Sequence, residues 1–345
     1  MKAMVLTGIR QMEMQEWPEP MIINETDVKI KMKRLGVCGS DVHYYTTGRI
    51  GSQVVDYPFP VGHEGAGIVM ETGSKVTRVK PGDEIAIDPA MPCNECEQCK
   101  AGRHHTCLNQ KFLGCPGQAD GSLSEYIVMP ESSCFPLTKK LSPDHGALSE
   151  PLSIGLYAMQ QSIPIQGKRV GILGMGPIGM SVLLPVMLNN PGSVYVTDKI
   201  DARLKMADEQ GVTLTANPVK EDIEKIILDA EPNGLDVVFE CCGQQEAADN
   251  ALNLLKPGGK LMIIGIPEFD RWSFSVDFMR RKEICIQNVR RQNNCVQPVL
   301  DMIENGSIHP DHMVTHRFSF SKTKEAFDMV ADYKDGVMKA MIDFD

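Results

Sequence analysis

A short polar stretch near the start of the sequence, GVCGSDVHYY at residues 36–45, holds several side chains that can do chemistry. It offers a thiol at Cys38, a hydroxyl at Ser40, an imidazole at His43 and two phenols. A thiolate can bind a soft metal ion, while hydroxyl and imidazole groups can pass a proton. A Gly-rich turn with a buried cysteine would explain the same residues, so the stretch alone does not establish a site.

Four further cysteines are spaced as in a metal site. They follow the pattern C-x2-C-x2-C-x7-C, at Cys93, Cys96, Cys99 and Cys107. Four thiolates at this density can complete a tetrahedral shell around zinc. An iron–sulfur cluster is the rival, but in bacterial ferredoxins the fourth cysteine comes three residues after the third and precedes proline. Here seven residues intervene and Leu108 follows, so we predict structural zinc.

The run GILGMGPIGM predicts a nucleotide site. Gly174, Gly176 and Gly179 have the G-x-G-x-x-G spacing between a predicted strand and a predicted helix. In this motif the first glycine permits a tight turn, the second lets the backbone approach a pyrophosphate, and the third lets helix and strand pack closely. Pro177 and Ile178 fall in the first helical turn, where proline is well tolerated. The alternative is a Gly-rich turn in an unrelated α/β protein.

Asp198 ends the next predicted strand, SVYVTD. A carboxylate at this place accepts hydrogen bonds from the adenosine ribose and repels a 2′-phosphate, so it favours NAD over NADP. Lys199 weakens this preference, because a cation there could pair with a phosphate. The alternative role for Asp198 is a helix N-cap, although Asp201 is better placed to cap.

Three more potential metal ligands are scattered along the chain: His63 and Glu64 in PVGHEGAG, and Glu150 in LSEPLS. Their spacing does not bring them to Cys38. Each also has a structural explanation, respectively a turn histidine, a surface carboxylate, and a carboxylate in the first turn of a helix.

Taken together, these segments resemble the zinc-dependent medium-chain alcohol dehydrogenases. CGSDVHYYTTGRIG, PVGHEGAGIV, the four-cysteine lobe, SEPLSIGLYA and GILGMGPIGM stand in the order and at the separations of that family. CGSDVHY followed by GRIG, and NVRRQNN with VTHRFSF, are similar to its sorbitol and xylitol dehydrogenase branch. The resemblance implies an α/β protein with a GroES-like β-rich catalytic domain and a Rossmann domain with a doubly wound parallel sheet.

The resemblance also implies two zinc ions per chain. The catalytic zinc would be held by Cys38 and His63, with Glu64 and Glu150 as direct or water-bridged ligands. Glu150 occupies the place where other alcohol dehydrogenases have a second cysteine. The four-cysteine lobe of residues 91–108 would hold the structural zinc.

Other roles follow from the resemblance in the same way. Ser40 and His43 match the family's proton relay, and Arg203 matches a contact to the adenosine side of NAD. Tyr44 and Arg290 match positions that contact the distal hydroxyls of polyols. Core packing for Tyr44 and a surface ion pair for Arg290 are the alternatives.

The implied activity is NAD-dependent oxidation of a secondary hydroxyl of a polyol to a ketose. Arg291 beside Arg290 adds a second cation, which suggests a phosphorylated or acidic polyol as an alternative substrate. A simple secondary alcohol, a diol or L-threonine is a further possibility within the family. A redox-inactive nucleotide-binding protein is the alternative from another class.

The pattern of elements divides the chain into two domains. Short alternating segments broken by Gly and Pro indicate a β-rich first part. From about residue 149, apolar strands alternate with amphipathic helices, which implies a parallel sheet covered on both faces. We predict a catalytic domain of residues 1–152 and 288–345, and a Rossmann domain of residues 153–287. The return of the tail to the first domain rests on the resemblance.

Within the Rossmann domain we expect helices at residues 177–188, 201–210, 219–229 and 244–255. Pro185 is expected to kink or shorten the first of them. We also expect a helix near residues 297–305 and a last strand, KAMIDFD.

Composition limits the possible partners and location. A formal net charge of −10 argues against a nucleic-acid surface. No segment has the apolar length of a membrane span or the form of a signal peptide. We therefore expect a cytoplasmic protein, in which the eleven cysteines do not indicate a disulfide framework, because the chain is long and has no secretory signal. A homodimer or homotetramer is expected, with an edge strand near residues 283–287 as a possible contact.

Overall fold

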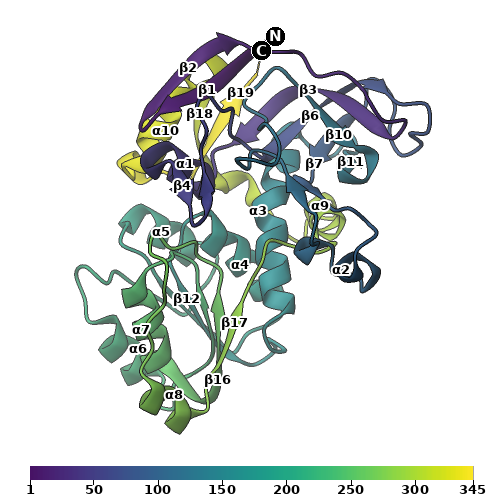
Figure 1. The fold of residues 1–345 in the computed structure, drawn as a ribbon. Helices are drawn as coiled ribbons and strands as arrows, with labels where there is room; N and C mark the ends of the chain where they lie inside the picture. Colours follow the sequence, from purple (N-terminus) through teal and green to yellow (C-terminus); the bar gives the residue numbers. More distant parts are fainter. Residues whose placement is uncertain (345) are drawn as a thin grey trace. The chain divides into compact units, whose positions relative to one another are not determined.

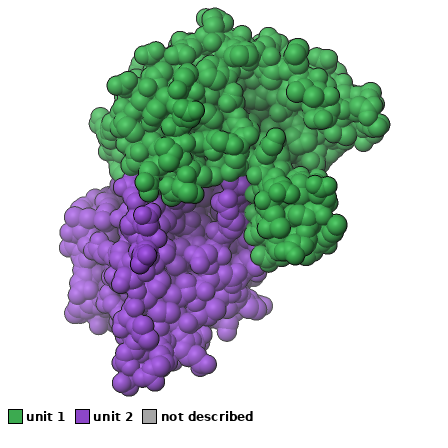
Figure 2. Space-filling view, viewed as in Figure 1, with its two compact units in different colours: residues 1–150, 296–345 green, residues 151–295 purple. Residues whose placement is uncertain are grey.

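The computed structural model describes residues 1–344, which form two compact units (Figures 1 and 2). The first unit contains residues 1–150 and the chain from residue 296 onward, and the second contains residues 151–295. The boundaries expected from the sequence, after residues 152 and 287, differ from these by two and eight residues. Residues 289–295 follow the last strand of the second unit and belong to that unit.

The first unit is built on a mainly antiparallel sheet. Its strands have the order β11-β7-β6-β3-β19-β18, and β10 also pairs with β3. Their bounds are β3 (Asp27–Gly36), β6 (Glu64–Thr72), β7 (Glu84–Ile87), β10 (Tyr126–Pro130), β11 (Cys134–Pro136), β18 (Val314–Ser319) and β19 (Lys339–Asp343). Val28, Ile30 and Met32 alternate along β3 and are fully buried, as expected for a strand with one face on a core.

The tail returns to this sheet through β19 (Figure 1). This strand pairs antiparallel with β3, and Met341 stands opposite Gly36 in the pairing. The composition of the tail does not indicate this pairing. Asp345, the last residue of the predicted KAMIDFD strand, lies outside the described residues.

The second unit contains a six-stranded parallel sheet of order β14-β13-β12-β15-β16-β17. The bounds are β12 (Arg169–Leu173), β13 (Ser193–Thr197), β14 (Leu214–Ala216), β15 (Leu235–Glu240), β16 (Leu255–Ile263) and β17 (Cys285–Asn288). The chain moves outward from β12 in one direction and returns to β15 on its other side, so the switch point of the sheet lies between β12 and β15. The expected doubly wound Rossmann sheet is confirmed.

Helices connect these strands: α4 (Pro177–Leu188), α5 (Asp201–Asp208), α6 (Ile223–Ala230), α7 (Gln245–Leu254) and α8 (Val276–Lys282). The sequence predicts that Pro185 kinks or shortens α4, but the helix is not shortened, because it continues to Leu188 as its predicted range has it. Pro185 has no N–H to give to the carbonyl of Ser181. A Cβ placed on Gly155 of α3 (Pro143–Gln160) would lie 2.0 Å from that carbonyl oxygen, so α3 passes close to α4 where the carbonyl is left open.

The remaining elements used below are α1 (Gly39–Thr47), α2 (Glu97–Lys100), α9 (Val296–Glu304) and α10 (Thr323–Ala331). Across residues 1–344 we find no helix with both the length and the apolar content that crossing a bilayer requires.

Candidate metal centres and nucleotide site

The four cysteines of the lobe lie around one point. All four sulfur atoms are within 4.8 Å of one another. The Sγ–Sγ distances are 3.4 Å for Cys93 and Cys107, 3.6 Å for Cys96 and Cys99, and 3.9 Å for Cys96 and Cys107. Four sulfurs bound tetrahedrally to zinc at about 2.3 Å would lie about 3.8 Å apart. The lobe therefore fits a structural zinc ion.

Backbone N–H groups of the lobe favour the thiolate form of one of these cysteines. N–H groups of Cys99 and Leu108 lower the pKa of Cys96 to about 6, and thiolates are the form that binds metals. Burial raises the pKa of Cys99 to about 12, so this thiol would have to lose its proton when the metal binds. None of the eleven cysteines, all within the described chain, forms a disulfide.

A second cluster collects residues that are scattered in the sequence. Cys38, His63 and Glu64 each place one ligand atom within 4.8 Å of the others. The pairing of β3 with β6 explains this, because it sets Glu64 opposite Gly36, two residues before Cys38. A thiol, an imidazole and a carboxylate are ligands that zinc takes. The cluster therefore fits a catalytic zinc with an open position.

Asp41 orients His63 and was missed in the sequence. Its carboxylate is fully buried, and Oδ1 lies 3.2 Å from Nδ1 of His63 and accepts from the N–H of Gly62 at 3.2 Å. Nδ1 therefore carries the hydrogen and leaves Nε2 for a metal. Burial alone would lower the pKa of His63, but Asp41 and Cys38 hold it well above its usual value.

Glu64 is buried and paired rather than a surface carboxylate. Its Oε2 lies 2.5 Å from Nζ of Lys339 on β19, and the two side chains are 2% and 1% exposed. Burial alone would lower the pKa of Lys339, but Glu64 and Cys38 raise it. Nothing in the sequence of the last strand pointed to this lysine.

Glu150 lies near this cluster but outside the group of three. It is 4% exposed and stands in the middle of α3, so the alternative explanation, a carboxylate in the first turn of a helix, is wrong. Burial raises its pKa to about 7, Glu64 adds to this effect, and His63 and Lys339 oppose it. Glu150 therefore lies within the electrostatic field of the cluster.

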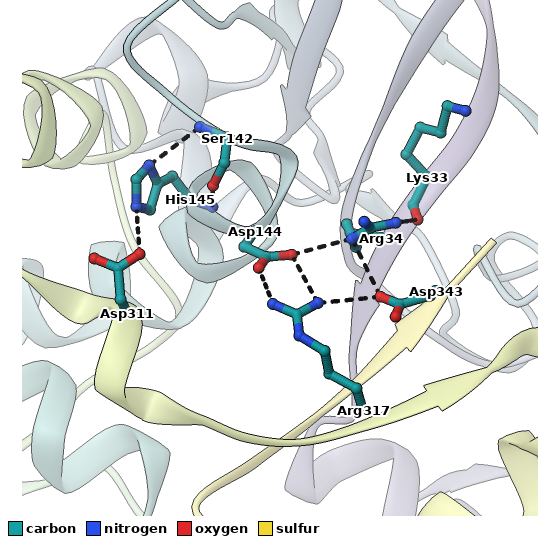
Figure 3. A network of polar contacts seen from close by, with 8 residues as sticks. All are labelled: Lys33, Arg34, Ser142, Asp144, His145, Asp311, Arg317 and Asp343. Carbon is teal, nitrogen blue, oxygen red and sulfur yellow. Dashed lines mark hydrogen bonds and ion pairs between the residues drawn. The ribbon is translucent and has the colours of Figure 1, made fainter. Parts of the chain in front are cut away.

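A network of charges fixes the start of α3 (Figure 3). Asp144 in its first turn accepts from Nε of Arg34 on β3, at 3.1 Å, and pairs with Arg317 on β18. Asp343 on β19 contacts both arginines at 3.2 Å. Such partly exposed pairs stabilise little singly but more as a network. They tie the helix that carries Glu150 to the strands that lead to Cys38 and carry Lys339.

Ser142 and His145 complete this helix start (Figure 3). The N–H of His145 donates to Oγ of Ser142 at 3.3 Å, and the N–H of Ser142 donates to Nδ1 of His145 at 3.2 Å. This is a reciprocal cap of the helix N-terminus. Nε2 of His145 in turn lies 3.0 Å from Oδ1 of Asp311.

Helix α1 carries the predicted relay and substrate residues of the first unit. Oγ of Ser40 donates to Sγ of Cys38 at 3.3 Å, and His43 is half-buried one turn further along. The hydroxyl of Tyr44 lies 3.2 Å from Oε1 of Gln53 and 3.7 Å from Sγ of Cys115. Tyr44 thus packs in the core and also has a directed hydroxyl.

The three glycines after β12 meet different needs. Gly174 has a φ of 93°, and a Cβ on Gly179 would lie 2.0 Å from the carbonyl oxygen of Gly174. The fold therefore requires glycine at both positions, because of the positive φ at Gly174 and the close backbone contact at Gly179. A Cβ on Gly176 would meet only Arg203 NH1, at 3.4 Å. Packing does not require glycine there, whereas a close approach of a pyrophosphate does, so the loop fits a dinucleotide.

Asp198 closes the same loop from the end of β13. Its Oδ2 accepts the N–H of Met175 at 2.6 Å, and Oδ1 accepts the N–H of Ile200 at 2.8 Å. The expectation that Asp201 caps α5 is wrong, because its carboxylate contacts Asn217 and pairs with Lys220 instead.

Arg290, the predicted substrate contact, is exposed and belongs to the second unit, beyond β17.

Comparisons with known proteins agree with this arrangement. Residues 24–139 match the family model of the alcohol dehydrogenase GroES-like domain, and residues 177–305 match that of the zinc-binding dehydrogenase. The chain is 35% identical to sorbitol dehydrogenase of Bacillus subtilis (strain 168), over 99% of this chain and 97% of that protein. It is 33% identical to L-idonate 5-dehydrogenase of Vitis vinifera, over 94% and 90%. A protein of Sinorhizobium meliloti 1021 solved with bound NADP has a TM-score of 0.88 at 28% identity, over 99% and 98%.

These matches and the fold show that the chain belongs to the family of zinc-dependent alcohol dehydrogenases. Within the family it falls in the polyol dehydrogenase branch, with sorbitol dehydrogenases among its relatives.

Proposed function

We propose that this chain oxidises a secondary hydroxyl of a sorbitol- or xylitol-like polyol to a ketose and passes the hydride to NAD. The observation that carries this proposal is the cluster of Cys38, His63 and Glu64, in a chain whose relatives include a sorbitol dehydrogenase. Three protein ligands leave a position for the substrate hydroxyl. Glu150 is the further candidate ligand, bound directly or through water.

The residues of the cluster have distinct tasks in this proposal. Zinc, when bound, supplies a Lewis acid that lowers the pKa of the substrate hydroxyl. Asp41 keeps Nε2 of His63 turned toward the metal. Ser40, whose hydroxyl contacts Cys38, and His43, one turn along α1, would take the hydroxyl proton toward solvent.

The preference for NAD rests on Asp198. Its carboxylate stands at the end of β13 beside the glycine loop, where a 2′-phosphate would meet negative charge. A structural relative contains NADP, so the choice needs a measurement. We expect kcat/KM to be at least about tenfold higher with NAD than with NADP, corresponding to about 1.4 kcal/mol. A higher value with NADP would contradict this assignment.

An acidic polyol is the second candidate substrate. One relative is an L-idonate 5-dehydrogenase at 33% identity, and Arg290 and Arg291 stand together in this chain. Guanidinium groups suit carboxylates and phosphates. Turnover of a neutral polyol, its phosphate and L-idonate, measured side by side, would distinguish these substrates.

A substrate panel tests the activity itself. We expect polyols of four to six carbons with NAD to raise the absorbance of NADH, because the cluster can bind a metal and a hydroxyl together. The Cys38→Ala variant is the control and should lose this activity. If polyols, sugar acids, simple alcohols and threonine all give no NADH, the chain is better explained as a nucleotide-binding protein without redox activity.

Metal analysis tests the two sites. We expect two zinc ions per chain, one in the cluster of three ligands and one in the four-cysteine lobe. The Cys38→Ala variant should retain about one zinc, because the four-thiolate lobe is a complete site. A single zinc in the wild type, or iron with visible absorption, would contradict the two-site model.

A further inference from the structure

Lys339 lies almost completely buried beside the cluster of Cys38, His63 and Glu64. Its Nζ is 2.5 Å from Oε2 of Glu64, and the two side chains are 1% and 2% exposed. The same Nζ donates to the carbonyl of Val37 at 3.1 Å. A charge buried this deeply has to be paired. The oxygen of Glu64 that pairs with Lys339 is thereby less available to any other cation.

The backbone fixes this pair in place. Lys339 opens β19, and the N–H of Val37 donates to the carbonyl of Ala340 at 2.9 Å. A Cβ on Gly36 would lie 2.3 Å from Oε2 of Glu64 and 3.2 Å from Cδ of Lys339. Because Gly36 has no side chain, the ion pair of Glu64 and Lys339 fits into the space beside it. Three paired strands, β6, β3 and β19, hold the two charges together.

We propose that Lys339 is a positioning residue that withholds one carboxylate oxygen of Glu64 from the catalytic metal. Glu64 then reaches the metal with its other oxygen alone or through water, and a position stays open for the substrate hydroxyl. The ammonium group also repels the metal, so Lys339 weakens metal binding at this cluster. The inference rests on the proposed function, since it requires a metal at Cys38 and His63.

The Lys339→Met variant tests this role, because it removes the charge and keeps the length of the side chain. We expect it to bind zinc at the Cys38 cluster about 10- to 100-fold more tightly than the wild type, which is opposite in direction to the loss of about this size that mutating partners of metal ligands usually causes. Competition with a chromophoric chelator measures this affinity, and the Cys38→Ala variant identifies which phase of zinc release belongs to the cluster. Weaker or equal zinc binding would overturn the proposal, because a purely structural lysine would loosen the site when removed.

Cobalt in place of zinc gives a second measurement that does not depend on activity. We expect the visible absorption of the cluster to weaken in Lys339→Met, because an additional carboxylate oxygen raises the coordination number of cobalt. An unchanged spectrum would count against the proposal. Lys339→Arg keeps the charge and should restore the wild-type affinity and spectrum.

Two further variants control for folding. Lys339→Gln removes the charge but keeps a hydrogen-bond donor for Glu64, and it should also bind zinc more tightly than the wild type, by a smaller factor. It replaces Lys339→Met in the test if that variant does not fold. Lys282→Met removes another partly buried ammonium group, which donates to three backbone carbonyls of the second unit, and should leave zinc binding unchanged. A wild type without metal at the cluster would defeat the proposed function. A wild type that binds metal and oxidises polyols, with no tightening in the variants, would defeat only the role of Lys339.

Discussion

At the scale of single residues, the ligands could be proposed from sequence but the residues that position them could not. The resemblance supplied Cys38, His63 and Glu64 because each stands in a recognisable segment. Asp41 stands three residues after Cys38 in CGSD, so its place in the same helical turn was a usable signal. Lys339 gave no such signal, since a lysine in a last strand is ordinarily exposed. Its burial depends on a partner 275 residues away.

The hydroxyl of Tyr44 provides a test of substrate recognition. Its contact with Gln53 fixes the direction of the hydroxyl, and losing one hydrogen bond to substrate changes binding by about 1 kcal/mol. We expect Tyr44→Phe to lower kcat/KM for a polyol about fivefold more than for a simple secondary alcohol.

The neighbouring tyrosine is a matched control. The hydroxyl of Tyr45 lies 2.7 Å from Oδ1 of Asp328 and 3.0 Å from the carbonyl oxygen of Arg10, and its hydrogen can bond to either. Tyr45→Phe should therefore lower stability without changing the ratio of the two substrates. If Tyr44→Phe lowers both turnovers equally, Tyr44 is a packing residue.

At the scale of elements, the sequence predicted which helices and strands exist better than it predicted where they begin and end. The bounds of α4 agree with the prediction because the glycine motif marks its start and Asn-Asn-Pro-Gly its end. Helix α6 starts at Ile223 rather than near residue 219, because Asp222 caps it by accepting the N–H of Lys225 at 3.0 Å. A cap decides such a start, and several polar residues before α6 could have served.

Three strands of the parallel sheet are tied together by Asp236 at the start of β15. It accepts the N–H of Arg169 on β12 at 2.8 Å and pairs with Lys256 on β16 at 2.5 Å. Burial alone would raise the pKa of Asp236, but Lys256 and Arg169 lower it to about 2. Because this pKa is lower in the folded state than its usual value near 4, ionised Asp236 stabilises the folded state at pH values above about 4. This stabilisation is lost as the pH falls toward 2.

Asp236→Asn should therefore be less stable than the wild type at pH 7 by about 2 kcal/mol, because one pKa unit corresponds to about 1.4 kcal/mol. The difference in stability between the variant and the wild type should shrink as the pH falls from 4 toward 2. Urea unfolding at each pH measures it. Asp277→Asn is the control, because its pairs with Arg280 and Arg281 are exposed and contribute little. A difference that does not vary with pH would contradict this account.

At the scale of the whole molecule, the two units differ in how the chain builds them. The second unit is continuous, whereas the first needs residues 1–150 and the segment after residue 296. In the sheet of the first unit β19 pairs with residues 34–36 of β3, so the first segment alone leaves this end of β3 as an unpaired strand edge. A cytoplasmic location and a homodimer or homotetramer stay predictions, with β17 at the edge of the parallel sheet as the candidate contact.

Separate expression of the two parts tests this difference. We expect residues 151–295 alone to fold and to bind NAD, because the whole six-stranded sheet and the glycine loop are present. Residues 1–150 alone should aggregate or remain unfolded, as judged by circular dichroism and gel filtration. A folded 1–150 fragment that binds zinc tightly would show that the last strand is dispensable.

The late position of Lys339 has a consequence for the newly made protein. The ribosome delivers Cys38, His63, Glu64 and Glu150 long before Lys339, and domains begin to fold during synthesis. Until β19 is made, Glu64 lacks its cation and β3 lacks the strand that pairs with its last residues. The cluster in which Glu64 is paired with Lys339 can therefore form only when synthesis of the chain is nearly complete.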